Sequence, residues 1–253
     1  MDVKILRNKG GKLDFVVEDT TVPFANALRR AMLTEVPVLA VDWVDFEENG
    51  SALFDETIAH RLAMLPLEFN PKKMNVSDDC SCKGVGCVNC QVVLALEKTG
   101  PGTATSGDLK STSKDVRPTD GNFPIVQLIE GQRLKFQAVA RIGFGRIHAK
   151  YQAANASYQF FPVISKAKPD EDLEPCPKNI VELKDGKPVI PDMTKLEINK
   201  ACKIGDYKIA PDATKILFHV ESISGLDPEY IVETAAQAVA TKAEEFRVAL
   251  KKV

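Results

Sequence analysis

The sequence predicts an α+β fold, because segments with the apolar pattern of strands are interspersed with three segments that have the period of helices. Strand-like apolar runs flank the glycines at 10 and 11 and recur in residues 38–50, 90–100, 125–143 and 215–225. Helix-like spacing occurs in residues 21–36, 53–65 and 228–250. With 253 residues, 44% of them hydrophobic, the chain has room for one large domain or two to three smaller ones.

The N-terminal segment predicts a β-hairpin followed by a helix. Residues 3–17 place two apolar runs around "NKGG", which is typical of a hairpin turn. The helix begins after Thr21, a possible cap, with Pro23 in a first turn that needs no N–H, and Pro37 ends it. One face of this helix is apolar and consists of Phe24, Leu28, Met32 and Val36.

The middle of the chain is predicted to be rich in strands. A strand at 38–50 leads into a helix that closes before Pro66, and a loop with four cysteines precedes the next strand. Residues 99–124 are rich in Gly, Pro, Ser, Thr and Asp, and predict a long loop of the kind that is functional or mobile. After two more strands, "RIGFGR" at 141–146 predicts a tight turn, and His148 a hydrogen-bonded structural residue.

A change in composition near Lys166 marks a small insert, residues 167–208, that is dense in Pro, Lys, Asp and Glu. Asp227 and Pro228 then begin a terminal helix with a continuous apolar seam. The seam consists of Val232, Ala236, Val239, Ala243, Phe246 and Leu250. Two interpretations are open: the seam packs on the chain's own sheet, or it forms an interface with a second subunit.

Composition argues against two classes of function. The chain has 33 Lys plus Arg against 35 Asp plus Glu, whereas a protein that grips nucleic acid usually carries a basic excess, so we expect no direct nucleic-acid contact. No apolar run approaches the ~20 residues that span a bilayer, and the N-terminus lacks the apolar core of a signal peptide. We therefore expect a cytoplasmic protein without a membrane contact.

The spacing C-x-C-x4-C-x2-C brings four thiols into one loop: Cys80, Cys82, Cys87 and Cys90. Thiolates are soft ligands, and four of them form the tetrahedral shell of a structural zinc. A catalytic zinc would leave one position for water, and a disulfide knot does not suit a reducing cytosol, so one structural Zn²⁺ is predicted. A [4Fe–4S] cluster and a loop that binds nothing are the alternatives.

The remaining two cysteines, Cys176 and Cys202, lie in the insert, and two cysteines alone cannot hold a cubane cluster. They are predicted to be ordinary thiols, with their pairing left open. The sequence contains no G-x-S-x-G, no phosphate-binding glycine loop and no D-x-D-x-D triplet. We therefore expect no active site in this chain.

Several stretches together resemble the D-type subunit of archaeal DNA-directed RNA polymerase, the counterpart of the third-largest subunit of eukaryotic RNA polymerase II and of the bacterial alpha N-terminal domain. They are "FANALRRAMLTEVPVLAVDWVDFEENGSALFDETIAHRLAMLPL", "SGDLKS", "IVQLIEGQRLKFQAVARIGFGRIHAKYQ" and the terminal seam. The resemblance runs from about residue 3 to the C-terminus. It implies an alpha-N-terminal-domain-like fold and a non-catalytic assembly platform for transcription, with the nucleotidyltransferase active site on other subunits.

The resemblance also implies three domains. Residues 1–42 and 209–253, with some of 160–166, would form a discontinuous dimerisation domain, and residues 43–160 an inserted β-rich domain that carries the cysteine loop. Residues 167–208 would be a small ferredoxin-like or degenerate element. The zinc loop fits the family, whereas the iron–sulfur cluster that some relatives hold in the third domain is not expected, because only two cysteines remain there.

The partners implied are the small alpha-like subunit L, as a heterodimer, the second-largest catalytic subunit, and the small zinc-binding subunits N and P. By carry-over from "NALRR", we expect Asn26, Arg29 and Arg30 to contact other subunits. The apolar residues Phe24, Leu28 and Met32 and the terminal seam complete this predicted interface. The alternative functions are a small iron–sulfur redox or electron-transfer protein and a free-standing zinc-loop binder of nucleic acid.

Overall fold

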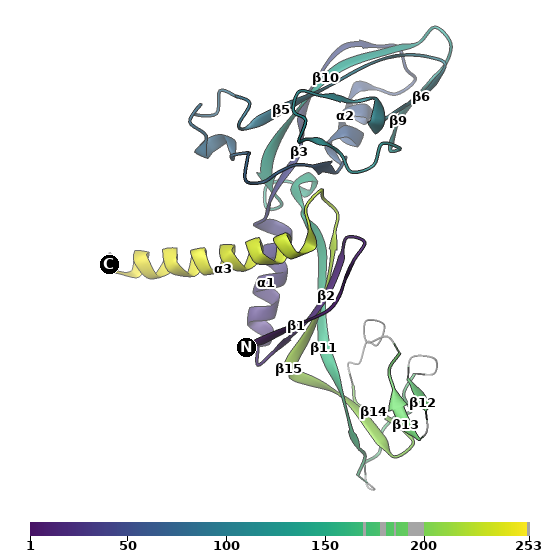
Figure 1. Cartoon of the computed structure of the whole chain (residues 1–253), viewed down its shortest axis with the longest axis vertical. Helices are drawn as coiled ribbons and strands as arrows, with labels where there is room; N and C mark the ends of the chain where they lie inside the picture. Colours follow the sequence, from purple (N-terminus) through teal and green to yellow (C-terminus); the bar gives the residue numbers. More distant parts are fainter. Residues whose placement is uncertain (169–170, 178–180, 185, 192–199, 252–253) are drawn as a thin grey trace. The chain divides into compact units, whose positions relative to one another are not determined.

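The computed structural model describes residues 1–168, 171–177, 181–184, 186–191 and 200–251. The chain divides into two compact units, each built from two separate segments. The first unit contains residues 1–30 and 156–221, and the second contains residues 31–155 and 222–253. Within these residues, strands predominate beside three α-helices, which confirms the predicted α+β class (Figure 1). The finer domain boundaries drawn from the sequence stay a prediction.

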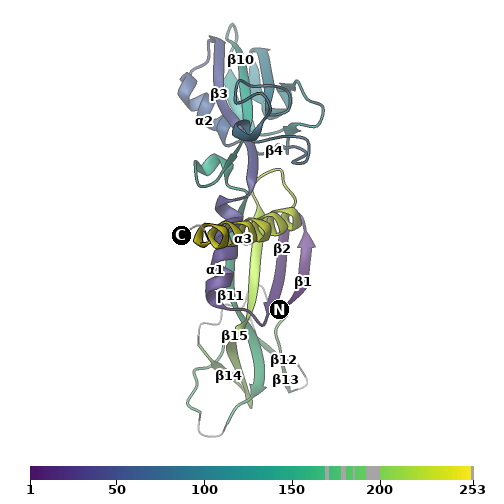
Figure 2. The same ribbon diagram turned by 90° about the vertical axis from the view of Figure 1, so that its left-hand side faces the viewer.

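The first unit is built on a sheet with the strand order β1-β2-β15-β11, and Figure 2 shows these strands side by side. They are β1 (Asp2–Lys9), β2 (Lys12–Glu18), β15 (Tyr207–Ser222) and β11 (Ala154–Lys166). Gly10 and Gly11 have φ of 63° and 75°, so they turn β1 into β2 and confirm the predicted hairpin. Phe15 stacks on Phe218 in the core, with ring centroids 4.9 Å apart.

The second unit contains a four-stranded sheet in the order β3-β10-β5-β7. Its strands are β3 (Pro37–Asn49), β10 (Arg133–Phe144), β5 (Gln91–Thr99) and β7 (Lys110–Ser111). The helix α2 (Asp55–Ala63) contacts β3 and buries Ile58 and Leu62. The strand-rich character predicted for this part of the chain is confirmed.

Residues 99–124 contain short strands, so the expectation of a long loop was wrong. β6 (Gly102–Thr105) pairs with β9 (Pro124–Leu128), and β8 (Arg117–Pro118) pairs with β4 (Leu67–Glu68). Ser106 is fully buried; its hydroxyl donates to the Asp120 carbonyl at 2.6 Å and accepts from the Phe123 N–H at 3.1 Å. These polar contacts hold a segment whose sequence offers little apolar surface.

The helices and turns at the ends of the strands follow the sequence closely. α1 (Val22–Thr34) begins just after Thr21 and ends before Pro37, as predicted. α3 (Pro228–Leu250) is capped by Asp227, whose carboxylate accepts from the Glu229 N–H at 2.9 Å. The turn predicted at 141–146 begins only at Gly145, because residues 141–144 still belong to β10. His148 accepts from the Lys150 N–H at 3.1 Å, the structural role expected of it.

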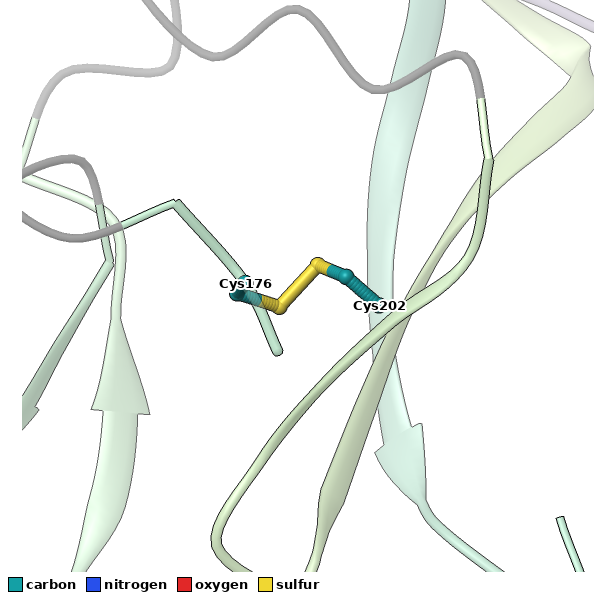
Figure 3. Close-up of a disulfide and its surroundings, with 2 residues drawn as sticks. All are labelled: Cys176 and Cys202. Atoms are coloured by element: carbon teal, nitrogen blue, oxygen red, sulfur yellow. A yellow bond between two sulfur atoms is a disulfide. The ribbon is translucent and has the colours of Figure 1, made fainter. Parts of the chain in front are cut away.

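The described part of the 167–208 insert contains short strands around a disulfide. β12 (Glu182–Lys184) and β13 (Lys187–Val189) form a hairpin, and β14 (Cys202–Ile204) pairs with β15. Cys176 and Cys202 are bonded to each other, so the prediction of two ordinary thiols was wrong (Figure 3). The reason is backbone pairing: the Cys176 N–H donates to the Lys203 carbonyl at 3.0 Å, which lays the two cysteines side by side. The rest of the insert lies outside the described residues, and its ferredoxin-like character stays a prediction.

We expect Cys202→Ser to lower the free energy of unfolding of this small element by about 3 kcal/mol, because a disulfide that closes a loop of this length restricts the unfolded chain. The bond spans 26 residues and lies beside Val181 and Ile209 in a small core. Native-state hydrogen exchange of the β14 and β15 amides measures the loss. Cys82→Ser, which removes a thiol elsewhere, is the matched control; equal exchange in the wild type and Cys202→Ser would contradict a stabilising bond.

Candidate metal centre and candidate subunit interface

Four thiol groups converge in the loop between α2 and β5. The sulfurs of Cys82 and Cys90 are 3.5 Å apart and those of Cys80 and Cys87 are 3.6 Å apart, and all four lie within 4.8 Å of one another. These separations are far longer than the ~2.0 Å of a disulfide. Four sulfurs placed ~2.3 Å from one zinc ion would lie about 3.8 Å apart. The donor set therefore fits one tetrahedral metal ion, and no histidine or carboxylate joins it in the described part of the chain.

The loop folds this way because its backbone reverses between the two pairs of cysteines. Three residues close together in the chain adopt positive φ: Lys83 at 53°, Gly84 at 82° and Gly86 at 103°. Glycine reaches this region without a steric cost, which explains the two glycines in the sequence. The Cys87 N–H donates to the Cys90 sulfur at 3.3 Å, and this hydrogen bond orients one ligand before any metal binds.

The surroundings of Cys82 and Cys90 shift the pKa values of their thiols in opposite directions. A backbone hydrogen bond at Gly86, joined by contacts with neighbouring thiols, lowers the pKa of Cys82 to about 6. Burial raises the pKa of the Cys90 thiol to about 12. The lowered pKa favours the thiolate of Cys82, which is the form that binds metal. A divalent ion deprotonates coordinating thiols outright, so the buried Cys90 is compatible with ligation.

The terminal helix leaves most of its apolar seam exposed: Ala236, Ala243, Phe246 and Leu250 are exposed, whereas Val232 and Val239 are half-buried. The residues that α3 buries are Pro228, Ile231 and Ala235, and none of them belongs to the seam. Successive residues of an α-helix are about 100° apart, so the seam, which starts at Val232, lies about 100° around the helix from Ile231. Its two largest residues, Phe246 and Leu250, are 66% and 59% exposed. Among the described residues, the C-terminal part of the seam is therefore not covered by this chain.

Glu35 anchors α3 within the second unit. Its carboxylate forms two ion pairs. Oε1 lies 2.7 Å from Nζ of Lys242 in α3, and Oε2 lies 2.6 Å from Nη1 of Arg146. Burial opposes ionisation of this carboxyl, but the hydrogen bonds and charges of Lys242 and Arg146 outweigh it and lower the pKa of Glu35. Sequence reasoning missed this group, because its three members are more than 90 positions apart from one another in the chain and no local pattern joins them.

Because the pKa of Glu35 is lowered, the stability that its ion pair with Lys242 gives to α3 depends on pH. A depressed carboxyl pKa adds stability that is present above the unfolded value of about 4.5 and is lost as pH falls through the lower folded value. We expect the α3 amides near Lys242 to lose protection below pH 4.5 in the wild type, measured as the exchange rate relative to the intrinsic rate at the same pH, and this extra acid response to disappear in Glu35→Gln. Glu244→Gln, which removes an exposed carboxylate paired with Arg247 on the same helix, is the control. An unchanged acid response in Glu35→Gln would contradict the assignment.

The residues predicted on α1 divide into two groups. Leu28 and Met32 are buried in this chain's own core, so their side chains are not available for direct contact. Phe24 is half-buried and Arg30 is exposed. Asn26 accepts from the Arg29 guanidinium at 3.0 Å, so these two side chains orient one another on the helix surface.

The segment of the chain that carries the cysteine loop matches a known domain family. Residues 44–165 match the family model described as the RNA polymerase Rpb3/RpoA insert domain. The chain thus carries the insert domain of alpha-like RNA polymerase subunits.

Relatives extend the similarity to the whole chain. It is 36% identical to DNA-directed RNA polymerase subunit Rpo3 of Archaeoglobus fulgidus, over 100% of this chain and 98% of the relative. The same subunit of Pyrococcus furiosus is 39% identical over 100% and 98%, and that of Methanothermobacter thermautotrophicus 34% over 97% and 97%. The chain belongs to this Rpo3 family of archaeal RNA polymerase subunits, as the sequence motifs indicated. Among the described helices, none is long and apolar enough to cross a membrane.

Proposed function

We propose that this chain is a non-catalytic assembly platform of DNA-dependent RNA polymerase. It pairs with the small alpha-like subunit L, and the heterodimer then gathers the second-largest catalytic subunit and the small zinc-binding subunits N and P. The observation that carries this proposal is the uncovered seam of α3, in which Phe246 and Leu250 are mostly exposed to solvent. Large apolar side chains left exposed along one helix are typical of a surface that a partner covers.

The other parts of the proposal rest on separate observations. One structural Zn²⁺ held by the four-cysteine loop would fix that loop, because four thiolates leave no position for a reacting water. Cys176 and Cys202 are joined to each other, so they do not offer thiolates to an iron–sulfur cluster. The near-balanced charge of the chain supports a role without direct nucleic-acid contact. The polymerase active site belongs to other subunits.

Reconstitution of the polymerase from separately purified subunits tests this function. We expect the complete set to assemble and to synthesise RNA on a template, and the set without this chain to leave the large subunits unassembled. The chain alone should transfer no nucleotide. Assembly of an active enzyme in its absence would overturn the platform role.

A further inference from the structure

The disulfide between Cys176 and Cys202 lies inside a segment that is small for a folded unit. Residues 167–208 are close to the size, about 40 residues, below which a domain usually needs a disulfide or a metal. Among the described residues, the thiols that could hold a metal lie in the four-cysteine loop and not in this insert. The disulfide is therefore the staple that the described part of the insert offers.

The bond is buried in a small apolar cluster. Cys176 is 9% and Cys202 is 7% exposed, and both belong to a cluster with Val181 and Ile209. Ile209 lies in β15 and is paired with Cys202 of β14. The staple thus holds β14 and its apolar neighbours against the main sheet of the first unit. A reductant in solution reaches the sulfurs only when this cluster opens.

Backbone hydrogen bonds align the two cysteines without using their sulfurs. The Cys176 N–H donates to the Lys203 carbonyl at 3.0 Å, and the Lys203 N–H donates to the Glu174 carbonyl at 2.8 Å. These contacts do not depend on the oxidation state of the thiols. They bring the cysteines side by side whenever the segment is closed, so the bond can form again after it has been reduced.

The other described contacts of this region constrain it less than a covalent bond does. β14 contributes only three residues, Cys202–Ile204, to its pairing with β15. An ion pair joins Lys208 to Glu171 at 2.8 Å, but both side chains are partly exposed, and such pairs add little stability. Loss of the disulfide should therefore leave the closed state of β14 only weakly held.

From these observations we infer that the insert is a redox-sensitive element, closed while Cys176 and Cys202 are bonded and opened by a dithiol reductant. One thiolate of the dithiol attacks a cysteine sulfur and forms a mixed disulfide, and its second thiol then displaces the protein sulfur. The two cysteines end as thiols, and the dithiol ends as its own disulfide. Opening separates β14 from β15 and exposes Ile209. The inference concerns this chain alone and does not rest on the proposed function.

The bond and the closed state stabilise each other by the same factor, because the two equilibria are linked. A disulfide that spans 26 residues is expected to lower the opening equilibrium at least about a hundredfold. Closing of the segment must then favour the bonded over the reduced cysteines by that same factor. This equality separates a redox-sensitive element from a bond that has no influence on the fold.

Equilibration of the full-length chain with mixtures of oxidised and reduced dithiothreitol tests one side of this equality. Alkylation followed by peptide mass spectrometry gives the bonded fraction of Cys176 and Cys202. We expect half reduction of the native chain to need a ratio of reduced to oxidised reagent about a hundredfold higher than in the urea-unfolded chain. Equal ratios in the two states would overturn the inference.

Hydrogen exchange of the β14 amides tests the other side. We expect exchange at Cys202–Ile204 to become about a hundredfold faster when the wild type is reduced and to recover on reoxidation. The double variant Cys176→Ser, Cys202→Ser should exchange at the faster rate with or without reductant. Cys82→Ser, which removes a thiol of the other loop, should respond to reductant as the wild type does. Unchanged β14 exchange in the reduced wild type would show that the bond does not control the insert.

Discussion

Phe246→Asp is expected to weaken the complex with the small alpha-like subunit by about 30- to 700-fold, because truncating a central aromatic of an interface costs about 2–4 kcal/mol, and each 1.4 kcal/mol is tenfold in the dissociation constant. Phe246 is the largest side chain of the seam and is mostly exposed in the single chain. The substitution also places a charge in a surface that a partner would exclude from water. Titration calorimetry of the purified subunits measures the change.

Val248→Asp is the matched control for this variant. Val248 is another exposed apolar residue of the last turns of α3, and helical geometry puts it about 160° around the helix from Phe246 and from Leu250. The same charge is introduced at the same end of the helix, so we expect a change of less than about threefold for an energetically peripheral position. Equal losses for both variants would mean that the partner does not recognise the seam.

Cys82→Ser is expected to reduce the zinc content from about one ion per chain to almost none, because a structural site needs its four ligands. Residues 76–91 should then exchange their amide hydrogens faster, since the loop depends on the metal and on few apolar contacts. The heterodimer should persist, because no residue of the α3 seam lies in this loop. Elemental analysis and size-exclusion chromatography measure both effects.

Two outcomes would contradict this assignment. Full zinc content in Cys82→Ser would show that Cys82 is not a ligand. Visible absorbance with labile sulfide in the anaerobically purified wild type would identify an iron–sulfur cluster instead of zinc. Cys202→Ser serves as the control, because it removes a thiol that is bonded to Cys176 and should leave the zinc content unchanged. Loss of the heterodimer in Cys82→Ser would mean that the loop contributes to folding of the whole subunit.

Local signals account for most of what the sequence predicted correctly. The glycines at 10 and 11, the helix start at Asp227 and Pro228 and the spacing of four cysteines each act over a few neighbouring residues, and the structure places all of them as expected. The same reasoning found the seam of α3 but could not decide between its two roles. The structure adds that Phe246 and Leu250 are mostly exposed, which favours the interface, and the interface itself stays a prediction.

The features that escaped prediction depend on contacts between distant parts of the chain. Glu35 meets Lys242 only in the folded state, and Cys176 reaches Cys202 through a backbone bridge to β14. The segment around Ser106 looked like a mobile loop because its order comes from buried polar contacts, which have no apolar period. In each case tertiary structure, rather than local propensity, places the side chain.

Coexpression with the small alpha-like subunit, followed by size-exclusion chromatography with light scattering, tests the platform role most directly. We expect a single species with the mass of a one-to-one heterodimer, and this species should be lost in Phe246→Asp and retained in Val248→Asp. A monodisperse monomer of 27.7 kDa that ignores the small subunit would contradict the proposed function.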